Sequence, residues 1–184
     1  MKLKDEQEYK AAIMAVNLYE GILRGGIRGL ITMIDEDMIP MFSRDVSKSV
    51  DYPNESVVKL IVGELERAKP TLNKVVSNVI RQRQLQDLHT HLIKEEELAP
   101  KEIDDLISAL DLFIRVGLGR IRDLSETLRF ESTLSEGDLT TLENRFTYIK
   151  QLLGFPTRGA RGIFHPHNRP IVRTAHNLLR RLER

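Results

Sequence analysis

Apolar residues recur every three or four positions along almost the whole chain, which is the spacing of one face of an α-helix. The clearest such stripe begins after Pro100 and consists of Ile103, Leu106, Ile107, Leu110, Phe113, Ile114, Ile121 and Leu124. Alternating patterns typical of strands are short. The pattern therefore predicts an all-α protein, a helical bundle of about six helices that forms a single domain over residues 1–184.

Prolines, glycines and a serine indicate where these helices begin and end. We expect helices that span residues 5–34, 54–68, 70–94, 99–124, 136–153 and 170–184. Pro70, Pro100 and Pro170 suit the first turn of a helix, where the N–H group that proline lacks would have no partner. Ser135 is followed by a carboxylate three residues later and predicts an N-cap, while Gly154 predicts a helix end.

Two connections between these helices stand out. Residues 43–54 are polar and form the predicted internal linker. Residues 154–170 form a loop of about 17 residues, and loops of this length tend to carry function. Phe155, Ile163 and Phe164 predict that this loop packs on the protein.

Two segments of the chain are similar at an offset of 94 residues. Residues 15–30 and 109–124 align without a gap, and six of the 16 positions are identical. The identical pairs are Ala15 and Ala109, Leu18 and Leu112, Gly25 and Gly119, Ile27 and Ile121, Arg28 and Arg122, and Leu30 and Leu124. Chance similarity of two amphipathic helices is the alternative to a true repeat. The paired glycine and arginine favour a repeat, which predicts two related helical units around residues 5–34 and 99–130.

The glycines of these segments have two interpretations. Gly21, Gly25 and Gly29 are four residues apart, so on a continuous helix they would lie on one face. Such a stripe, with Gly117 and Gly119 in the second segment, favours close packing of another helix. Alternatively, the glycines interrupt the helices and present backbone N–H groups to an anion. We favour close packing and, because only 5% of the residues are aromatic, we predict a homo-oligomer.

Residues 109–121 read Ala-Leu-Asp-Leu-Phe-Ile-Arg-Val-Gly-Leu-Gly-Arg-Ile. They resemble the pattern Ala-Leu-x-Leu-Tyr-x-Arg-Ile-Gly-Leu-Gly-Gln-Phe found in small helical proteins of bacteria, prophages and phages. Those proteins often end with Gly-Ile-x-x-Pro and a terminal helix, similar to residues 162–166 and 174–184 here. This chain departs from the pattern at Phe113 and Arg120. The resemblance implies a phage-related accessory protein and brings no established activity with it.

Charge is balanced over the whole chain but not along it. The net charge is +1, whereas residues 154–184 hold seven arginines, three histidines and one acid, which gives +6 for that segment and −5 for the rest. Arginine favours planar, bidentate contacts with carboxylates and phosphates. The segment is therefore either an anion-binding edge or a basic tail that packs on acids of its own or a neighbouring chain.

The candidate ligand-binding residues gather in the loop before the last predicted helix. They are Arg158, Arg161, His165, His167 and Arg169 in the loop, together with Arg122 and Arg28 beside the paired glycines. Glycines, arginines and a helix N-terminus just downstream are typical of an anion-binding cradle. The alternative is a subunit-packing loop whose arginines pair with acids of another helix.

Other classes of site lack support in the sequence. The chain has no cysteine, which excludes disulfides, thiolate zinc sites and cysteine nucleophiles. His89 and His91 point to different faces of a helix, so we expect no metal there. No phosphate-loop, dinucleotide-binding or nucleophile-elbow motif occurs, so we expect neither a cofactor nor catalytic residues. Without a signal peptide or a long apolar run, we expect a cytoplasmic location and no membrane partner.

Three functional hypotheses follow. The leading one is a non-enzymatic, homo-oligomeric binding protein that captures an anionic, nucleotide-derived ligand, as a phage protein would to sequester a host signal. The alternative is a protein-interaction module that inhibits or scaffolds a host or virion protein. The third is a nucleic-acid-associated regulator, which near-neutral charge and few aromatic residues disfavour.

Overall fold

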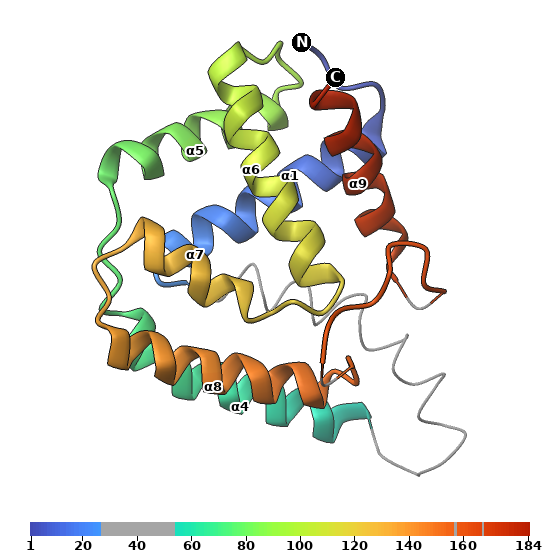
Figure 1. The fold of residues 1–184 in the computed structure, drawn as a ribbon. Helices are drawn as coiled ribbons and strands as arrows, with labels where there is room; N and C mark the ends of the chain where they lie inside the picture. The colour runs from blue at the N-terminus through green and yellow to red at the C-terminus, as the bar shows by residue number, and fades with distance from the viewer. Residues whose placement is uncertain (27–53, 157, 167) are drawn as a thin grey trace.

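The computed structural model describes residues 1–26, 54–156, 158–166 and 168–184. These residues form seven helices and no strand, so the all-α prediction is confirmed, with one helix more than expected (Figure 1). The helices are α1 (Glu6–Leu23), α4 (Asn54–Leu72), α5 (Val79–Ile93), α6 (Pro100–Gly117), α7 (Asp123–Glu131), α8 (Glu136–Leu152) and α9 (Pro170–Leu182).

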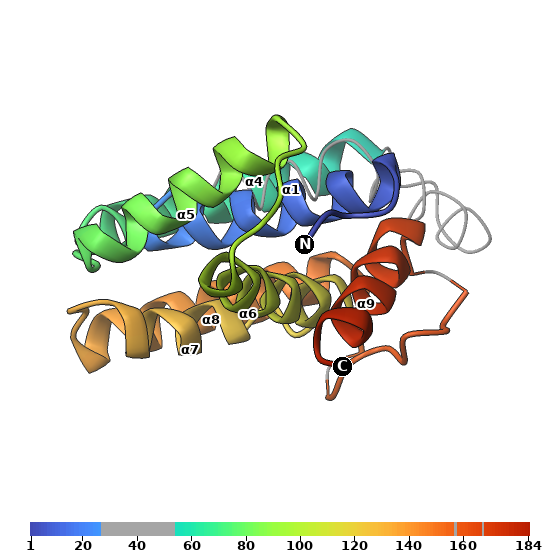
Figure 2. The ribbon, with the colours of Figure 1, turned by 90° about the horizontal axis from the view of Figure 1, so that it is seen from above.

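The helices form two layers, which Figure 2 shows edge-on. One layer contains α1, α4 and α5, and the other contains α6, α7, α8 and α9. Between the layers, α1 packs on α6 and α4 packs on α8. The helix α1 also packs on α5 and α9, while α6 packs on α9 and α5. An approximate two-fold axis that exchanges α1 with α6 and α5 with α9 would relate these contacts to one another.

The first helices of the two layers begin and end at equivalent positions. Both α1 and α6 have 18 residues, and their bounds differ by 94, which is the offset of the sequence repeat. Each is followed by a glycine with positive φ, Gly25 at 67° and Gly119 at 95°. The N–H groups of Gly26 and Arg120 then bond back to carbonyls five residues earlier, which closes a Schellman cap in both cases. The paired glycine of the repeat is therefore the residue that ends each helix.

The later helices of the two layers share the spacing of their buried residues. The buried positions are Ile61, Leu65, Ala68 and Leu72 on α4, and Leu142, Phe146, Ile149 and Leu153 on or at the end of α8. The intervals are the same in both sets. Leu85, Leu88 and Leu92 of α5 match Val172, Ala175 and Leu179 of α9 in the same way. These side chains contribute to one core between and within the layers.

Several predicted boundaries are confirmed and others are wrong. Pro100 and Pro170 are the first residues of their helices, Ser135 caps α8, and Gly154 follows that helix with a φ of 66°. The helix expected over residues 5–34 already ends at Leu23, because Gly25 adopts a left-handed conformation. The helix expected over 99–124 is divided into α6 and α7 for the same reason, at Gly119. The predicted linker over residues 43–54 lies almost wholly outside the described residues.

The prediction that a helix begins at Pro70 is also wrong. Pro70 lies in the last turn of α4, and α5 starts only at Val79. The intervening turn is held by side chains: Ser77 donates its hydroxyl to the carbonyl of Leu23 at 2.6 Å, and Asn78 caps α5 by accepting from the N–H of Ile80. These contacts separate two helices that the apolar pattern alone does not divide at this point.

Candidate functional site

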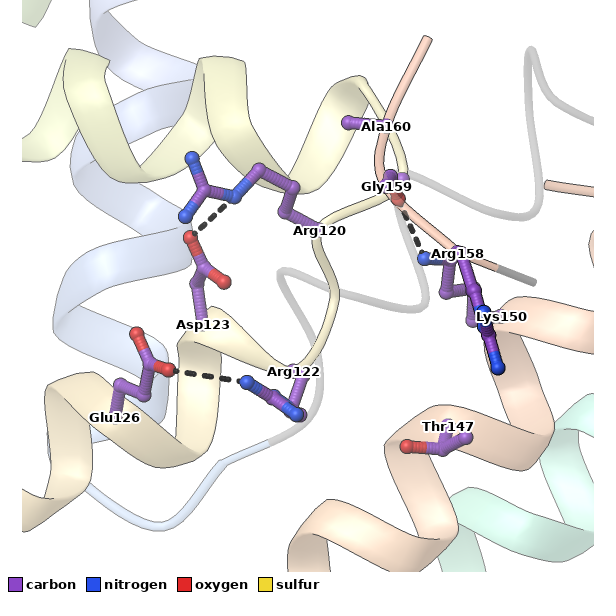
Figure 3. Close-up of a pocket in the computed structure, with 10 residues that line it drawn as sticks. Arg120, Arg122, Asp123, Glu126, Thr147, Lys150, Arg158, Gly159 and Ala160 are labelled. Carbon is purple, nitrogen blue, oxygen red and sulfur yellow. Dashed lines mark hydrogen bonds and ion pairs between the residues drawn. The ribbon is translucent and has the colours of Figure 1, made fainter. Parts of the chain in front are cut away.

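A cavity of about 580 Å³ lies where three segments of the second layer meet (Figure 3). The segments are the turn between α6 and α7 with the first turn of α7, the C-terminal half of α8, and the start of the long loop. The lining residues are Gly119, Arg120, Arg122, Asp123, Glu126, Thr147, Lys150, Arg158, Gly159 and Ala160. We call this cavity the basic pocket, because four of these side chains are cationic and two are acidic.

The α6–α7 side of the basic pocket is fixed by a buried carboxylate. Asp123 is 4% exposed, and its Oδ2 accepts a hydrogen bond from Arg115 Nη1 at 3.2 Å and forms an ion pair with Arg120 Nε at 3.1 Å. Gly119 makes the turn, with the ring of Phe155 packed so closely over it that a β-carbon would overlap the ring. Asp123 is thus already shared by two arginines and offers little repulsion to an anion.

The opposite side of the basic pocket keeps its positive charge. Lys150 Nζ donates to the carbonyl of Gly159 at 2.7 Å, a neutral partner that leaves the ammonium charge uncompensated (Figure 3). Arg158 is exposed and makes no hydrogen bond or ion pair with any residue that the structure describes. Arg122 contacts Glu126 at 3.6 Å, and the two side chains are 61% and 41% exposed. Cations consequently outnumber acids around the cavity.

The structure brings together two of the predicted ligand-binding residues, Arg122 and Arg158, although 36 positions separate them in the sequence. Arg120 and Lys150 join them and were not among the predicted residues. Arg120 follows the paired Gly119, so its position in the repeat was a usable signal. Lys150 lies on a polar helix face like many others, and nothing in the sequence distinguishes it.

The other predicted loop residues that the structure describes do not line the basic pocket. Arg161 stacks on the ring of Phe155 at 4.6 Å and donates to the carbonyl of Gly154. Arg169 is 4% exposed and precedes α9 as its N-cap. The N–H of His165 bonds to the carbonyl of Gly162 within the loop. Arg28 and His167 lie outside the described residues.

The predicted helix-packing glycines contact segments of their own chain. The carbonyl of Leu72 lies against Gly25, and a β-carbon on Gly117 would stand 2.6 Å from Val172 Cγ2 on α9. Gly21 belongs to the last turn of α1, and its carbonyl accepts from the N–H groups of Arg24 and Gly26. Gly29 lies outside the described residues. Close approach is thus observed at Gly25, Gly117 and Gly119, but within one chain, so these glycines give no reason to expect a second copy.

A buried ionic cluster joins the two layers at the other end of α7. Arg81 of α5 is paired with Asp105 of α6, and its guanidinium lies 5.5 Å from the ring centroid of Tyr19. The hydroxyl of Tyr19 donates to Glu131 Oε1 at 2.9 Å. Burial is the largest cause that raises the pKa of Tyr19 above 10.0. All four groups have partners inside the protein, so we assign the cluster a structural role.

A second ionic cluster joins α4 to α8. Glu64 is buried and accepts from Arg145 of α8 at 2.8 Å and from Arg67. The hydrogen bond from Arg145 is the largest cause that holds the pKa of Glu64 below 4.5. This carboxylate is therefore ionised and unsuited to act as a general acid near neutral pH.

The described residues include no group of three or more histidines and acids placed to hold a metal ion. His91 Nδ1 instead lies 2.5 Å from Glu102, which joins α5 to α6. Among the same residues, no helix is long and apolar enough to cross a membrane.

No protein-family model, curated protein or solved structure matches this chain.

Proposed function

We propose that this protein binds an anionic small molecule in the basic pocket without transforming it. The proposal rests on one observation: Arg120, Arg122, Lys150 and Arg158 line a cavity whose one buried acid, Asp123, is already paired twice. A cavity of about 580 Å³ falls within the range of small-molecule sites. An anion would lower the repulsion between the cations, so binding would stabilise the folded protein.

The chemistry of the lining favours a ligand with phosphate groups. One arginine guanidinium can donate two parallel hydrogen bonds to the oxygens of a phosphate, whereas lysine supplies a point charge. The cavity is larger than a single phosphate requires, and Thr147 adds a hydroxyl to its wall. A phosphorylated nucleoside or another nucleotide-derived ligand satisfies both size and charge. Sequestering such a molecule is the role that we propose.

The test is a thermal unfolding screen of the full chain against phosphate, pyrophosphate, nucleoside triphosphates, cyclic dinucleotides and citrate. We expect the phosphorylated compounds of nucleotide size to raise the Tm most. Arg122→Ala combined with Arg158→Ala should abolish the shift, and Arg184→Ala, at the exposed C-terminus, should preserve it. A flat response of the wild-type protein across the panel would refute ligand binding at this pocket.

A second candidate function is protein interaction through the long loop. Phe164 is 80% exposed, yet its surroundings are fixed: Arg173 donates to its carbonyl, and Asn168 donates to the carbonyls of Gly162 and Ile163. Exposed aromatic side chains on a rigid base often anchor interfaces. This candidate predicts that the wild-type protein recovers a stoichiometric partner from host lysate and that Phe164→Ala does not. A partner recovered equally by both proteins would contradict it.

A further inference from the structure

The basic pocket contains an acidic side chain whose oxygens are not used within the protein. Glu126 of α7 lines the cavity, is 41% exposed and lies 3.6 Å from Arg122, a separation too long for a hydrogen bond. No residue that the structure describes donates a hydrogen bond to this carboxylate. Asp123, one turn earlier, is by contrast paired with two arginines. The oxygens of Glu126 are therefore available to accept hydrogen bonds from a ligand.

A carboxylate at this place lowers the affinity of the basic pocket for a bare anion. The negative charge of Glu126 repels the anion that the cations of the pocket attract, and it competes with the anion for Arg122. A cavity that held only an inorganic anion would bind it more tightly without Glu126. The acid instead suits a ligand that carries hydrogen-bond donors beside its negative charge, because an ionised carboxylate only accepts hydrogen bonds.

A second polar group of the cavity is also available to a ligand. The hydroxyl of Thr147 on α8 makes no hydrogen bond with any residue that the structure describes. The hydroxyls of Thr140 and Thr141, on the same helix, donate to the carbonyls four residues earlier. Thr147 lies one turn before Lys150, so the two side chains share a face of α8. Figure 3 shows both on the α8 side of the cavity, across from the residues of α7.

These two groups favour a ligand with sugar hydroxyls. A sugar hydroxyl can donate to the carboxylate of Glu126, as ribose hydroxyls do to acidic residues in dinucleotide sites. Another hydroxyl can exchange hydrogen bonds with Thr147, since hydroxyl groups both donate and accept. An ammonium group on the ligand is disfavoured, because the guanidinium of Arg122 lies 3.6 Å from the same carboxylate and would repel it. The donors that suit Glu126 are therefore uncharged.

We propose that Glu126 and Thr147 are specificity-determining residues, which select the phosphate ester of a sugar over an inorganic anion. This inference rests on the proposed function, because it assigns a second part of the ligand to the same cavity. Lys150 and Arg158 contact the phosphate, while Glu126 and Thr147 bind hydroxyls of the sugar. The sugar phosphate is either free or part of a nucleotide, since both present the same hydroxyl and phosphate groups.

Isothermal titration of the full chain with ribose 5-phosphate and with pyrophosphate tests the proposal, because only the first probe carries a sugar. Glu126→Gln should lower the affinity for ribose 5-phosphate relative to pyrophosphate about tenfold, since it removes a charged acceptor and relieves the repulsion of pyrophosphate. Glu143→Gln is the matched control and should keep the wild-type ratio, since Glu143 also lies 3.6 Å from an arginine, Arg129, but does not line the cavity. Tighter binding of adenosine 5′-monophosphate than of ribose 5-phosphate would indicate a nucleotide, and equal or weaker binding a free sugar phosphate.

Thr147→Val is a second variant, which keeps the charge of the pocket and should lower the same ratio about threefold or more, whereas Thr140→Val should not. A loss of folded structure would weaken the binding of both probes alike. A ratio that Glu126→Gln or Thr147→Val leaves unchanged overturns the proposal. So does a wild-type protein that binds pyrophosphate but not ribose 5-phosphate, and in both cases the proposed function stands. A wild-type protein that binds neither probe refutes both.

Discussion

The backbone carbonyl of Leu72 occupies the space that a β-carbon on Gly25 would need. Gly25 thus both ends α1, with a φ of 67°, and admits the end of α4. Gly119 has the same two roles. It ends α6 and it admits the ring of Phe155, a residue that follows α8. In both layers, the first helix ends at a glycine, and the segment at the end of a later helix packs on that glycine.

Gly25→Ala should destabilise the protein by about 3 kcal/mol or more, because the substitution adds left-handed backbone strain to a clash with a main-chain carbonyl. Gly63→Ala is the matched control, since Gly63 lies inside α4 and no atom beyond its chain neighbours and its own helix backbone stands within 4 Å of the place that an alanine methyl group would take. It should stabilise the protein by about 0.5–1 kcal/mol. Urea denaturation of both variants measures the two effects. Equal effects of the two substitutions would contradict the role assigned to Gly25.

Glu64→Gln should lower the free energy of unfolding at neutral pH by about 1–3 kcal/mol, because it replaces a buried, charged acceptor. Since the pKa of Glu64 is held below 4.5, its stabilising effect is present above that pH and is lost as the pH falls through the lowered pKa. Unfolding measured between neutral and acid pH should therefore depend less steeply on pH in the variant.

Glu66→Gln is the control for that experiment. Glu66 is on the same helix, but its side chain is 54% exposed and lies 3.4 Å from Lys69. Its removal should change the stability by less than about 0.5 kcal/mol. A Glu64→Gln variant that keeps the wild-type dependence on pH would show that Glu64 titrates normally in the folded protein.

Asp105→Ala should lower the free energy of unfolding by about 3–5 kcal/mol. The guanidinium of Arg81 is largely buried, and the substitution removes the carboxylate that pairs with it. Asp111→Ala removes a carboxylate from the same helix that is 49% exposed and pairs with Arg115 at 2.7 Å. That change should cost less than about 1 kcal/mol. Thermal unfolding of the two variants gives the comparison, and similar losses would argue against a special role for the cluster between the layers.

Arg161→Ala should affect the loop and not the ligand. Loss of its contact with Phe155 should cost about 1 kcal/mol and speed chymotrypsin cleavage after Phe164, since the loop opens more often. The affinity of the basic pocket for pyrophosphate should change less than about twofold, because Arg161 does not line the cavity. A tenfold loss of affinity would show instead that the loop around Arg161 forms part of the binding site.

Local signals in the sequence predicted the helical class and the caps at Ser135 and Gly154, because side-chain spacing and capping act within a few residues. They did not locate the start of α5. Pro70 suits a first turn, but contacts from Ser77 to distant Leu23 fix the actual boundary. The basic pocket could not be predicted for the same reason, since it joins segments around residues 120, 150 and 158. Only tertiary structure places Lys150 beside Arg158.

Isothermal titration of the full chain with pyrophosphate at low salt tests the central claim most directly, since this probe carries the proposed charge and needs no identified ligand. We expect one binding site per chain. Arg122→Ala with Arg158→Ala should weaken binding about tenfold or more, whereas Arg184→Ala should bind as the wild type does. Absence of binding to the wild-type protein, or equal binding by the double variant, would contradict the account.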